Sequence, residues 1–280
     1  MIRLNSTNVL KKSNANTNVK SKKDKKLKDE AKSNKFIQQI VSPIAILIIW
    51  EILADLKLID TRFFPAPSMI FHSFINLLTT GILLNDLSVS LFRIIGGFIV
   101  GAVPGLIIGL TMGLFPIIRN ILDPIVAATY PIPKLALMPL IMIIFGLNDL
   151  EKIVVIAIGT FFIVLMNTAA GVINLDKIYM DVARNYGASK KDYYLTVALP
   201  GALPMIFTGL KLGMGMALLL IVAAEMNGAS SGIGYRIWES YNIFDIPAMF
   251  VSFIIMSILG YVFTIILDLI EKLIIPWKHS

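Results

Sequence analysis

The chain is a series of long apolar runs separated by short polar segments, after a polar beginning. Crossing a bilayer as an α-helix takes about 20 consecutive apolar residues, and six runs reach or approach that length: 37–56, 94–114, 121–146, 152–173, 205–226 and 247–271. Pro131 and Pro133 interrupt the third run, but neighbouring helices can satisfy the carbonyls that a proline leaves free. The pattern therefore predicts an all-α integral membrane protein with six transmembrane helices.

Composition supports this class and locates the charge. Of the 280 residues 56% are hydrophobic, and the mean hydropathy is +0.79, above that of an average soluble domain. Residues 1–35 contain eleven basic and three acidic residues, so their net charge is +8 and that of the remaining chain is −1. Few aromatic residues lie among these lysines, which argues against nucleic-acid binding. The composition predicts a disordered basic cytoplasmic tail that sets topology or binds anionic lipid.

The residues that most often carry chemistry are scarce. There is no cysteine, which excludes thiolate metal sites and cysteine nucleophiles, and the two histidines, His72 and His279, are far apart in the sequence. No GxxxxGK[ST] loop occurs, so the chain does not bind ATP through the usual phosphate-binding loop. We predict neither an enzyme nor a cofactor-binding chain, and uphill transport would need energy from a partner or from an ion gradient.

Positive residues in the loops predict the orientation, because lysine and arginine favour the cytoplasmic side. The basic tail and the loop 174–204, with four basic residues, fall on one side. The loops 147–151 and 227–246 fall on the other side and carry only Arg236 as a basic residue. The longer loop 57–93 also falls on that side but carries three basic residues, so it fits the rule less well. With six spans, both termini are expected in the cytoplasm.

The longest polar segment within the membrane-like part predicts two short helices with a break between them. Residues 176–186 can form the first helix, and Gly187 follows where a left-handed C-terminal cap is expected. Ser189, with Asp192 three residues later, resembles the capping box that starts a helix. We expect Pro200 and Pro204 to end this second helix. Such a hinged pair is suited to contacting a partner rather than to catalysis.

Glycine recurs every four residues along the second predicted span, at Gly97, Gly101, Gly105, Gly109 and Gly113. Lipid tails are as apolar as leucine, so spans associate through close van der Waals contact, which glycine permits. We predict that this face packs on another helix, of the same chain or of a second copy. The fifth span carries a shorter stripe of Gly209, Gly213 and Ala217.

Several charged residues fall within or at the end of apolar runs, and two of them, Lys134 and Glu225, are singled out here. A charge at the bilayer centre costs about 2.5–3.5 kcal/mol, so such a residue usually faces a cavity or a partner. Lys134 either supplies positive potential to an anionic solute, or extends to the interface or pairs with a carboxylate. Glu225 either lines the outer mouth of a pathway or is an ordinary interfacial acid. Both are candidate residues of a translocation pathway.

The polar segment also resembles the coupling-loop signature of ABC importer permeases. The signature has an acidic residue, an alanine two positions later and a glycine four positions after that, with Leu-Pro about a dozen residues further on. Aspartate and valine stand here where glutamate and alanine are usual. In the family this loop docks on the cytoplasmic ATPase and carries its motion to the membrane. The resemblance therefore implies ATPase coupling by Asp181, Ala183, Gly187, Ala188, Leu199 and Pro200.

Three further segments resemble the same family, so that the likeness covers about residues 64–277: SVSLFRIIGGFIVGAVPGLIIGLTMG, PIPKLALMPLIMIIFGL and AAEMNGASSGIGY. They look most like the subgroup that imports nitrate, aliphatic sulfonates, taurine or bicarbonate, and thiamine or riboflavin precursors. That subgroup often has Arg-Pro where this chain has Tyr130 and Pro131. The difference leaves vitamin-precursor import open beside import of a sulfonate, taurine, nitrate or a similar anion.

The resemblance implies a type I ABC importer (MetI-like) permease fold for residues 36–280, with coupling helices at about 176–199. It implies a permease subunit that receives a small solute from an extracytoplasmic binding protein. The implied partners are a second copy of the chain, membrane lipids and a pair of cytoplasmic subunits that hold ATP and Mg²⁺. The contrasting class is an ion-coupled secondary transporter, which would carry an inverted repeat with paired broken helices, and no such repeat is evident in the sequence.

Overall fold

The computed structural model describes residues 41–278, except for the side chains of residues 177, 180, 184, 190 and 278. The predicted basic tail at 1–35 and the start of the first predicted span lie outside the described residues. The chain forms two compact units, Met1–Ser68 and Met69–Ser280. The predicted boundary at residue 35 lies outside the described residues.

The described part of the first unit is a helix over residues 41–55 followed by turns. Most of its apolar side chains are exposed, as on a helix that faces lipid. Glu51 holds this unit together, because its carboxylate accepts hydrogen bonds from the Ser68 amide at 3.0 Å and from the Ser68 hydroxyl at 2.6 Å. The first of these bonds satisfies an amide that the first turn of a helix leaves unpaired, at the start of α2 (Pro67–Thr79).

From α2 onward the described chain is helical, with short connections. The elements that follow are α3 (Ile82–Leu114), α4 (Pro116–Thr129), the 3₁₀ turn η1 (Lys134–Leu137), α5 (Met138–Phe145), α6 (Asp149–Ile173), α7 (Lys177–Asn185), α8 (Lys190–Tyr193), the π-helical turn η2 (Tyr194–Ala198), α9 (Leu199–Met226), α10 (Ile233–Asn242), α11 (Ile246–Ile274) and η3 (Pro276–Lys278).

Four helices of the described range are long and apolar enough to cross a membrane: Ile82–Leu114, Asp149–Ile173, Lys191–Met226 and Ile246–Ile274. The pair α4 and η1–α5 adds a fifth if it is counted as one broken span. The first of the six predicted spans begins outside the described residues. The second predicted span starts twelve residues earlier than expected, since α3 begins at Ile82, and at about 1.5 Å per residue it is longer than a bilayer core is thick.

The glycine stripe of α3 lies against α6 of the same chain. A Cβ at Gly101 would come within 2.3 Å of the Ala157 carbonyl oxygen, and one at Gly109 within 2.6 Å of the Leu165 carbonyl oxygen. Real side chains never approach so closely, so glycine is what allows the two backbones to meet. The choice left open by the sequence, between the same chain and a second copy, is therefore settled in favour of the same chain for this face.

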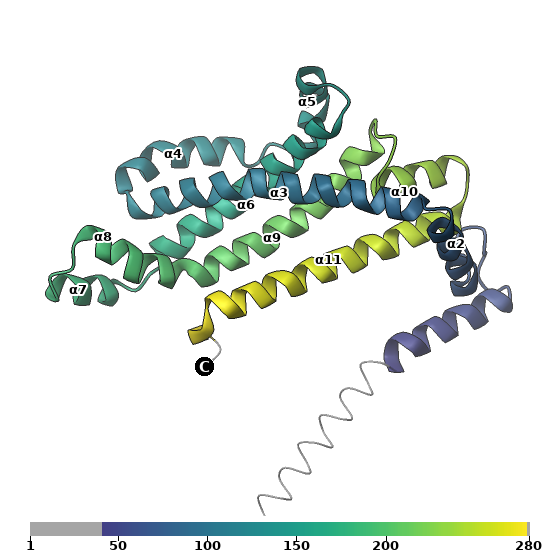
Figure 1. The fold of residues 1–280 in the computed structure, drawn as a ribbon, viewed down its shortest axis with the longest axis horizontal. Helices are drawn as coiled ribbons and strands as arrows, with labels where there is room; N and C mark the ends of the chain where they lie inside the picture. Colours follow the sequence, from purple (N-terminus) through teal and green to yellow (C-terminus); the bar gives the residue numbers. More distant parts are fainter. Residues whose placement is uncertain (1–40, 279–280) are drawn as a thin grey trace, which may run out of the picture. The chain divides into compact units, whose positions relative to one another are not determined.

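The central helix α6 also packs on α9, and α11 covers α9 from its other side (Figure 1). A Cβ at Gly209 would lie 2.6 Å from the Asn167 Cβ, so the shorter stripe likewise serves a helix contact within the chain. α11 is joined to α9 by Lys211, which forms ion pairs with Asp268 and Glu271. The α7–α8 segment lies at one end of this bundle and α10 at the other (Figure 1).

The apolar run 121–146 is broken where the sequence places its interruption, because the chain bends by 83° between α4 and η1–α5, where Pro131 and Pro133 remove two amide donors. One detail of the prediction is wrong, since the prolines Pro200 and Pro204 do not end a helix. Pro200 lies in the first turn of α9, where a missing amide costs nothing, and Pro204 is carried inside α9.

Candidate functional site

The hairpin formed by α7, α8 and the turn between them is closed by local capping bonds. Gly187 has a φ of +74°, and the Ala188 amide donates to the Ala183 carbonyl at 3.0 Å. A left-handed glycine with this bond is the Schellman arrangement that ends a helix. The expected capping role of Gly187 is thus present in the structure, and the alanines of the signature are the two residues that its bond joins.

The second helix of the hairpin starts with a reciprocal capping box, as the sequence predicts. The Ser189 amide and hydroxyl donate to Asp192 Oδ2 at 3.2 and 2.6 Å, and the Asp192 amide donates to the Ser189 hydroxyl at 3.2 Å. These bonds satisfy amides that the first helical turn leaves without partners. The bonds of both caps lie within residues 183–192, so the turn between α7 and α8 is held by the hairpin's own residues.

One face of α7 is apolar and exposed. Ile178, Val182 and Tyr186 follow one another at four-residue spacing, which places them on one side of the helix, and they are 58%, 48% and 88% exposed. Asp181 of the signature is exposed on the same helix. A capped helix that turns an apolar stripe outward at the end of a bundle presents a surface for a partner.

The hairpin is joined to α9 without a break in the helical path. The Leu199 amide donates to the Tyr194 carbonyl, five residues back, which is a π-type bond. Two residues favour this widened turn. The Thr196 hydroxyl donates a hydrogen bond to the Asp192 carbonyl at 2.6 Å, and Pro200 has no amide hydrogen to donate to the Thr196 carbonyl. Leu199 packs against the buried Val172, Ala202 and Ile206. The Leu-Pro of the signature therefore lies where the hairpin enters the membrane bundle.

A second polar group surrounds Glu225, which lies in the last turn of α9 beside α10, and α10 is at the bundle end opposite to the hairpin (Figure 1). The Glu225 carboxylate is 1% exposed and accepts from Arg93 Nη1 at 2.8 Å, from the Ser90 hydroxyl at 2.8 Å and from the Gly234 amide at 2.8 Å. Arg93 also donates to Asp149 at 2.6 Å. Glu225 therefore joins the ends of α3, α6, α9 and α10, and is not an exposed interfacial acid.

Asp86 extends this group, which we call the Glu225 cluster, toward α10. Its carboxylate accepts from the Gly232 amide at 2.9 Å and from Arg236 Nε at 2.8 Å. Arg236 also pairs with Glu239 on α10. On the same helix, burial and the neighbouring Glu239 raise the pKa of Tyr235 above its usual value.

The loop between α9 and α10 can close over the cluster only because two positions lack a side chain. A Cβ at Gly232, where φ is +123°, would lie 2.4 Å from the Glu225 carboxylate carbon. A Cβ at Gly234 would lie 2.6 Å from the Val222 carbonyl oxygen. The glycines of the AAEMNGASSGIGY segment thus allow its backbone amides to reach Glu225 and Asp86.

Lys134, the other candidate pathway residue, lies at the bend between α4 and η1. Its Nζ donates to the carbonyls of Tyr130 at 2.8 Å and Thr129 at 3.2 Å, the last carbonyls of α4, where a cation is favourable. The ammonium lies 4.5 Å from the centre of the Phe162 ring, within cation–π range. Among the ion pairs of the described residues Lys134 has no carboxylate partner.

Sequence reasoning missed three residues of the Glu225 cluster and the apolar stripe of α7. Asp86, Ser90 and Arg93 lie more than 130 residues before their partners at the end of α9 and the start of α10, and a single sequence carries no signal for such a pairing. The stripe of α7 was visible in principle, since Ile178, Val182 and Tyr186 follow the four-residue spacing of a helix face.

Comparison with known proteins agrees with this geometry. Residues 101–279 match the family of the binding-protein-dependent transport system inner membrane component. The chain is 32% identical over 245 residues to a protein named as an aliphatic sulfonates transport permease, SsuC, of Bacillus subtilis (strain 168), covering 88% of this chain and 89% of that one. It is 30% identical over 243 residues to the taurine transport system permease TauC of Escherichia coli (strain K12), covering 85% and 88%.

A solved structure shows the same fold. A chain of the MetNI methionine ABC transporter, in an inward-facing conformation, superposes with a TM-score of 0.50 at 18% identity, covering 70% of this chain and 96% of that one. The all-α, MetI-like permease fold predicted from the sequence is thereby confirmed. The chain is a member of the binding-protein-dependent transport system inner membrane component family, the multi-pass permease components of ABC transporters.

Proposed function

We propose that the chain is the permease subunit of an ATP-driven importer, and that the α7–α8 hairpin is the site through which a cytoplasmic ATPase moves it. The observation that carries this proposal is the exposed apolar stripe of α7, on a hairpin whose caps are complete without help from the bundle. Such a hairpin can move as one body. Its continuous helical path into α9 supplies the route by which that movement reaches the membrane.

The coupling residues have distinct roles in this proposal. Asp181 and the apolar stripe contact the ATPase, while Ala183, Gly187 and Ala188 form the cap that sets the angle of the hairpin. Leu199 and Pro200 lie at the flexible base, where the π-type turn allows α8 to shift relative to α9. The chain itself hydrolyses no ATP, and ATP with Mg²⁺ belongs to the partner subunits.

The assembly that we propose contains two copies of the chain, two ATPase subunits and an extracytoplasmic binding protein. The hairpin and both termini then face the cytoplasm, and the Glu225 cluster with α10 faces the binding protein. The basic residues of the 174–204 loop support this orientation. Residues 36–280 form the permease domain in this proposal, preceded by a basic tail.

The proposed solute is a small organic anion that carries a sulfonate group. The two relatives described above are named for aliphatic sulfonates and for taurine, and taurine is itself an aminosulfonate. Lys134 provides the cation that an anionic solute requires, because it lies at a helix break with no carboxylate partner among the described ion pairs. The Glu225 cluster holds the outer ends of the helices in place and does not itself bind the solute.

Reconstituted uptake tests this proposal. Proteoliposomes that contain the permease, its ATPase and its binding protein should accumulate taurine or ethanesulfonate only when ATP is present on the ATPase side. Gly187→Val should reduce uptake at least tenfold, because a β-branched residue is strongly disfavoured at a φ of +74°.

Gly187→Asn is the matched control. A Cβ at this position meets no atom within 4 Å, and asparagine tolerates the left-handed conformation, so this variant should keep most of the uptake. Uptake driven by an ion gradient without the ATPase would contradict the proposal in favour of a secondary transporter. Accumulation of a thiamine or riboflavin precursor in place of sulfonates would contradict the proposed solute alone.

A further inference from the structure

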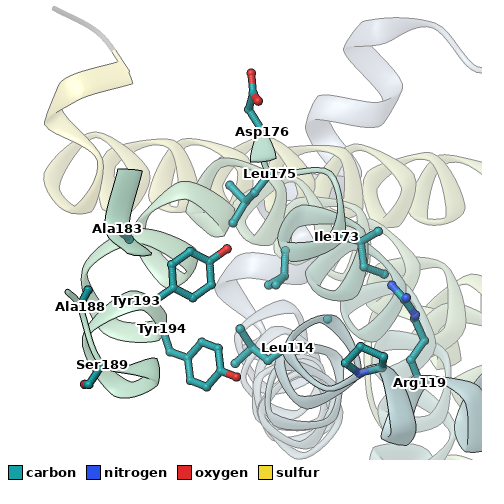
Figure 2. Close-up of a pocket in the computed structure, with 13 residues that line it drawn as sticks. Leu114, Arg119, Ile173, Leu175, Asp176, Ala183, Ala188, Ser189, Tyr193 and Tyr194 are labelled. Carbon is teal, nitrogen blue, oxygen red and sulfur yellow. The ribbon is translucent and has the colours of Figure 1, made fainter. Parts of the chain in front are cut away.

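A cavity of about 520 Å³ lies between the hairpin and the membrane bundle. The capping residues Ala183 and Ala188 line it on the hairpin side, but neither the proposed ATPase contact nor the candidate pathway requires a cavity at this place. One wall comes from the α3–α4 corner and the end of α6, and the other from the hairpin and η2 (Figure 2). Its size falls within the range of small-molecule sites, roughly 300–1,000 Å³. An occupant of this cavity would touch both the moving hairpin and the bundle.

The lining has an apolar part and a cationic part. Tyr193 and Tyr194 reach from the hairpin side toward Leu175 and Leu114, while Arg119 lies on the opposite wall (Figure 2). No hydrogen bond to either tyrosine hydroxyl is present among the described residues. The aromatic rings of Tyr194 and Phe115 are in edge contact, with centroids 5.7 Å apart, which holds this wall against the α3–α4 corner.

Arg119 is half-buried, and the ion pairs of the described residues do not include it. A partly desolvated guanidinium without a carboxylate is a ready partner for an oxyanion, which it can bind through two parallel hydrogen bonds. The one carboxylate of the lining, Asp176, accepts the Ile178 amide at 3.0 Å and points away from the cavity (Figure 2). The charge of the lining therefore favours an anion.

From these observations we infer that the cavity behind the hairpin is a binding site for an amphipathic anion, with its oxyanion head on Arg119 and its apolar chain between Tyr193, Tyr194 and Leu114. Two sources share this chemistry: a free organic anion of the cytoplasm, or the head group of an anionic lipid. Binding would fix the hairpin and η2 relative to the α3–α4 corner. If the hairpin transmits the movement of an ATPase, fixing it would reduce uptake. This effect on uptake rests on the proposed function, whereas the binding site does not.

Binding of 1-octanesulfonate to the purified permease–ATPase complex in nanodiscs of neutral lipid tests the site. Titration calorimetry should show saturable binding to the wild-type complex and much weaker binding of the cation octyltrimethylammonium. Arg119→Gln should weaken octanesulfonate binding by roughly tenfold to a hundredfold, the usual loss for a charge-assisted contact, and Arg119→Lys should restore part of it.

Lys272→Gln is the matched control, since it removes one positive charge from an exposed position in the last turn of α11, and it should bind octanesulfonate like the wild type. Repeating the titration in nanodiscs with phosphatidylglycerol identifies the source. Competition by this lipid that disappears in Arg119→Gln supports a lipid head group, and unchanged affinity supports a free anion.

Absent binding to the wild-type complex, equal binding by Arg119→Gln in a complex of unchanged melting temperature, or equal binding of the cation would overturn the inference. Because the titration involves no transport, its outcome is separate from that of the proposed function. A complex that binds octanesulfonate through Arg119 but shows no ATP-driven uptake would keep this site and refute the proposed function.

Discussion

The two ends of the helical bundle are held by opposite means. At the α10 end, Glu225, Arg93 and Asp86 are 1%, 5% and 1% exposed and join four helices through ion pairs and backbone amides. At the hairpin end, the polar bonds described above join residues two to five positions apart and lie on the surface. The α10 end is fixed to the core. The hairpin end is held by its own local hydrogen bonds and is joined to α9 through a widened helical turn.

This difference teaches where movement can enter the molecule. A buried ion pair is costly to separate, since each desolvated charge would lose its partner, so the α10 end should move with the core. The hairpin has no comparable attachment among the described residues, and the π-type turn at its base is a common site of helix adjustment. The asymmetry therefore favours force entering at the hairpin and being transmitted by α9.

The largest expected effect comes from breaking the buried ion pair between Glu225 and Arg93 at the α10 end. Glu225→Ala should lower the free energy of unfolding by about 3–5 kcal/mol, because it leaves Arg93 buried with one carboxylate instead of two. Thermal unfolding of the purified protein measures this loss. Asp60→Ala, which breaks an exposed pair with Arg62, should leave the melting temperature unchanged, and equal losses in both variants would contradict a rigid Glu225 cluster.

The next largest effect concerns the partner surface of the hairpin. Tyr186→Ala should weaken binding of the ATPase subunit by about 2 kcal/mol, roughly thirtyfold, as expected for an exposed aromatic residue that becomes buried in an interface. Surface plasmon resonance with the immobilised ATPase gives the affinity. The same truncation at the other end of the bundle, Tyr241→Ala on α10, should not change it. If Tyr241→Ala weakened ATPase binding more than Tyr186→Ala, the ATPase would bind at the α10 end and the proposed site on the hairpin would be wrong.

An effect of similar size, on stability rather than on ATPase binding, is expected from the glycine face of α3. Gly101→Ala should destabilise the protein by about 1–3 kcal/mol, because the added methyl group would meet the Ala157 carbonyl at 2.3 Å. Gly215→Ala is the control within a helix of the same chain, since nothing lies within 4 Å of its Cβ, and alanine should be neutral or stabilising there. Similar melting temperatures for the two variants would argue against close packing of α3 on α6.

The smallest effect is expected at the hairpin cap. Ser189→Ala should lower the free energy of unfolding of α8 by about 1 kcal/mol, because it removes one half of the capping box. Hydrogen exchange should become faster at the amides of α8 and remain unchanged at α10. Faster exchange at both ends would mean that the hairpin is not an independent body.

Local features of the fold could be predicted from the sequence because their causes are local. The left-handed Gly187, the capping box of Ser189 and the glycine period of α3 each depend on residues within a few positions of one another. The helix that continues through Pro200 was predicted wrongly. A proline tolerated in a first helical turn and one that ends a helix look alike in a sequence, and the difference lies in the π-type bond from the Leu199 amide to the Tyr194 carbonyl.

The Glu225 cluster could not be predicted for a different reason. The sequence identifies Glu225 as a charge at the end of an apolar run. It places Arg93 in a loop, because the predicted span begins at residue 94. The structure begins that helix at Ile82, which places Ser90 and Arg93 on a buried helical face. The interruption at Pro131 and Pro133 could be predicted, but its angle of 83° could not, since prolines within a span can either be accommodated or break it.

The most direct test of the central claim, that an ATPase acts on the hairpin from the cytoplasmic side, uses the absence of cysteine from the chain. Single cysteines at exposed positions, Val182→Cys in the apolar stripe of the hairpin and Ile243→Cys after α10, are labelled with a membrane-impermeant maleimide. We expect Val182→Cys to react only in inside-out vesicles and only after the ATPase has been stripped, while Ile243→Cys reacts from the outside. Labelling of Val182→Cys in intact cells, or equal labelling with and without bound ATPase, would contradict the central claim.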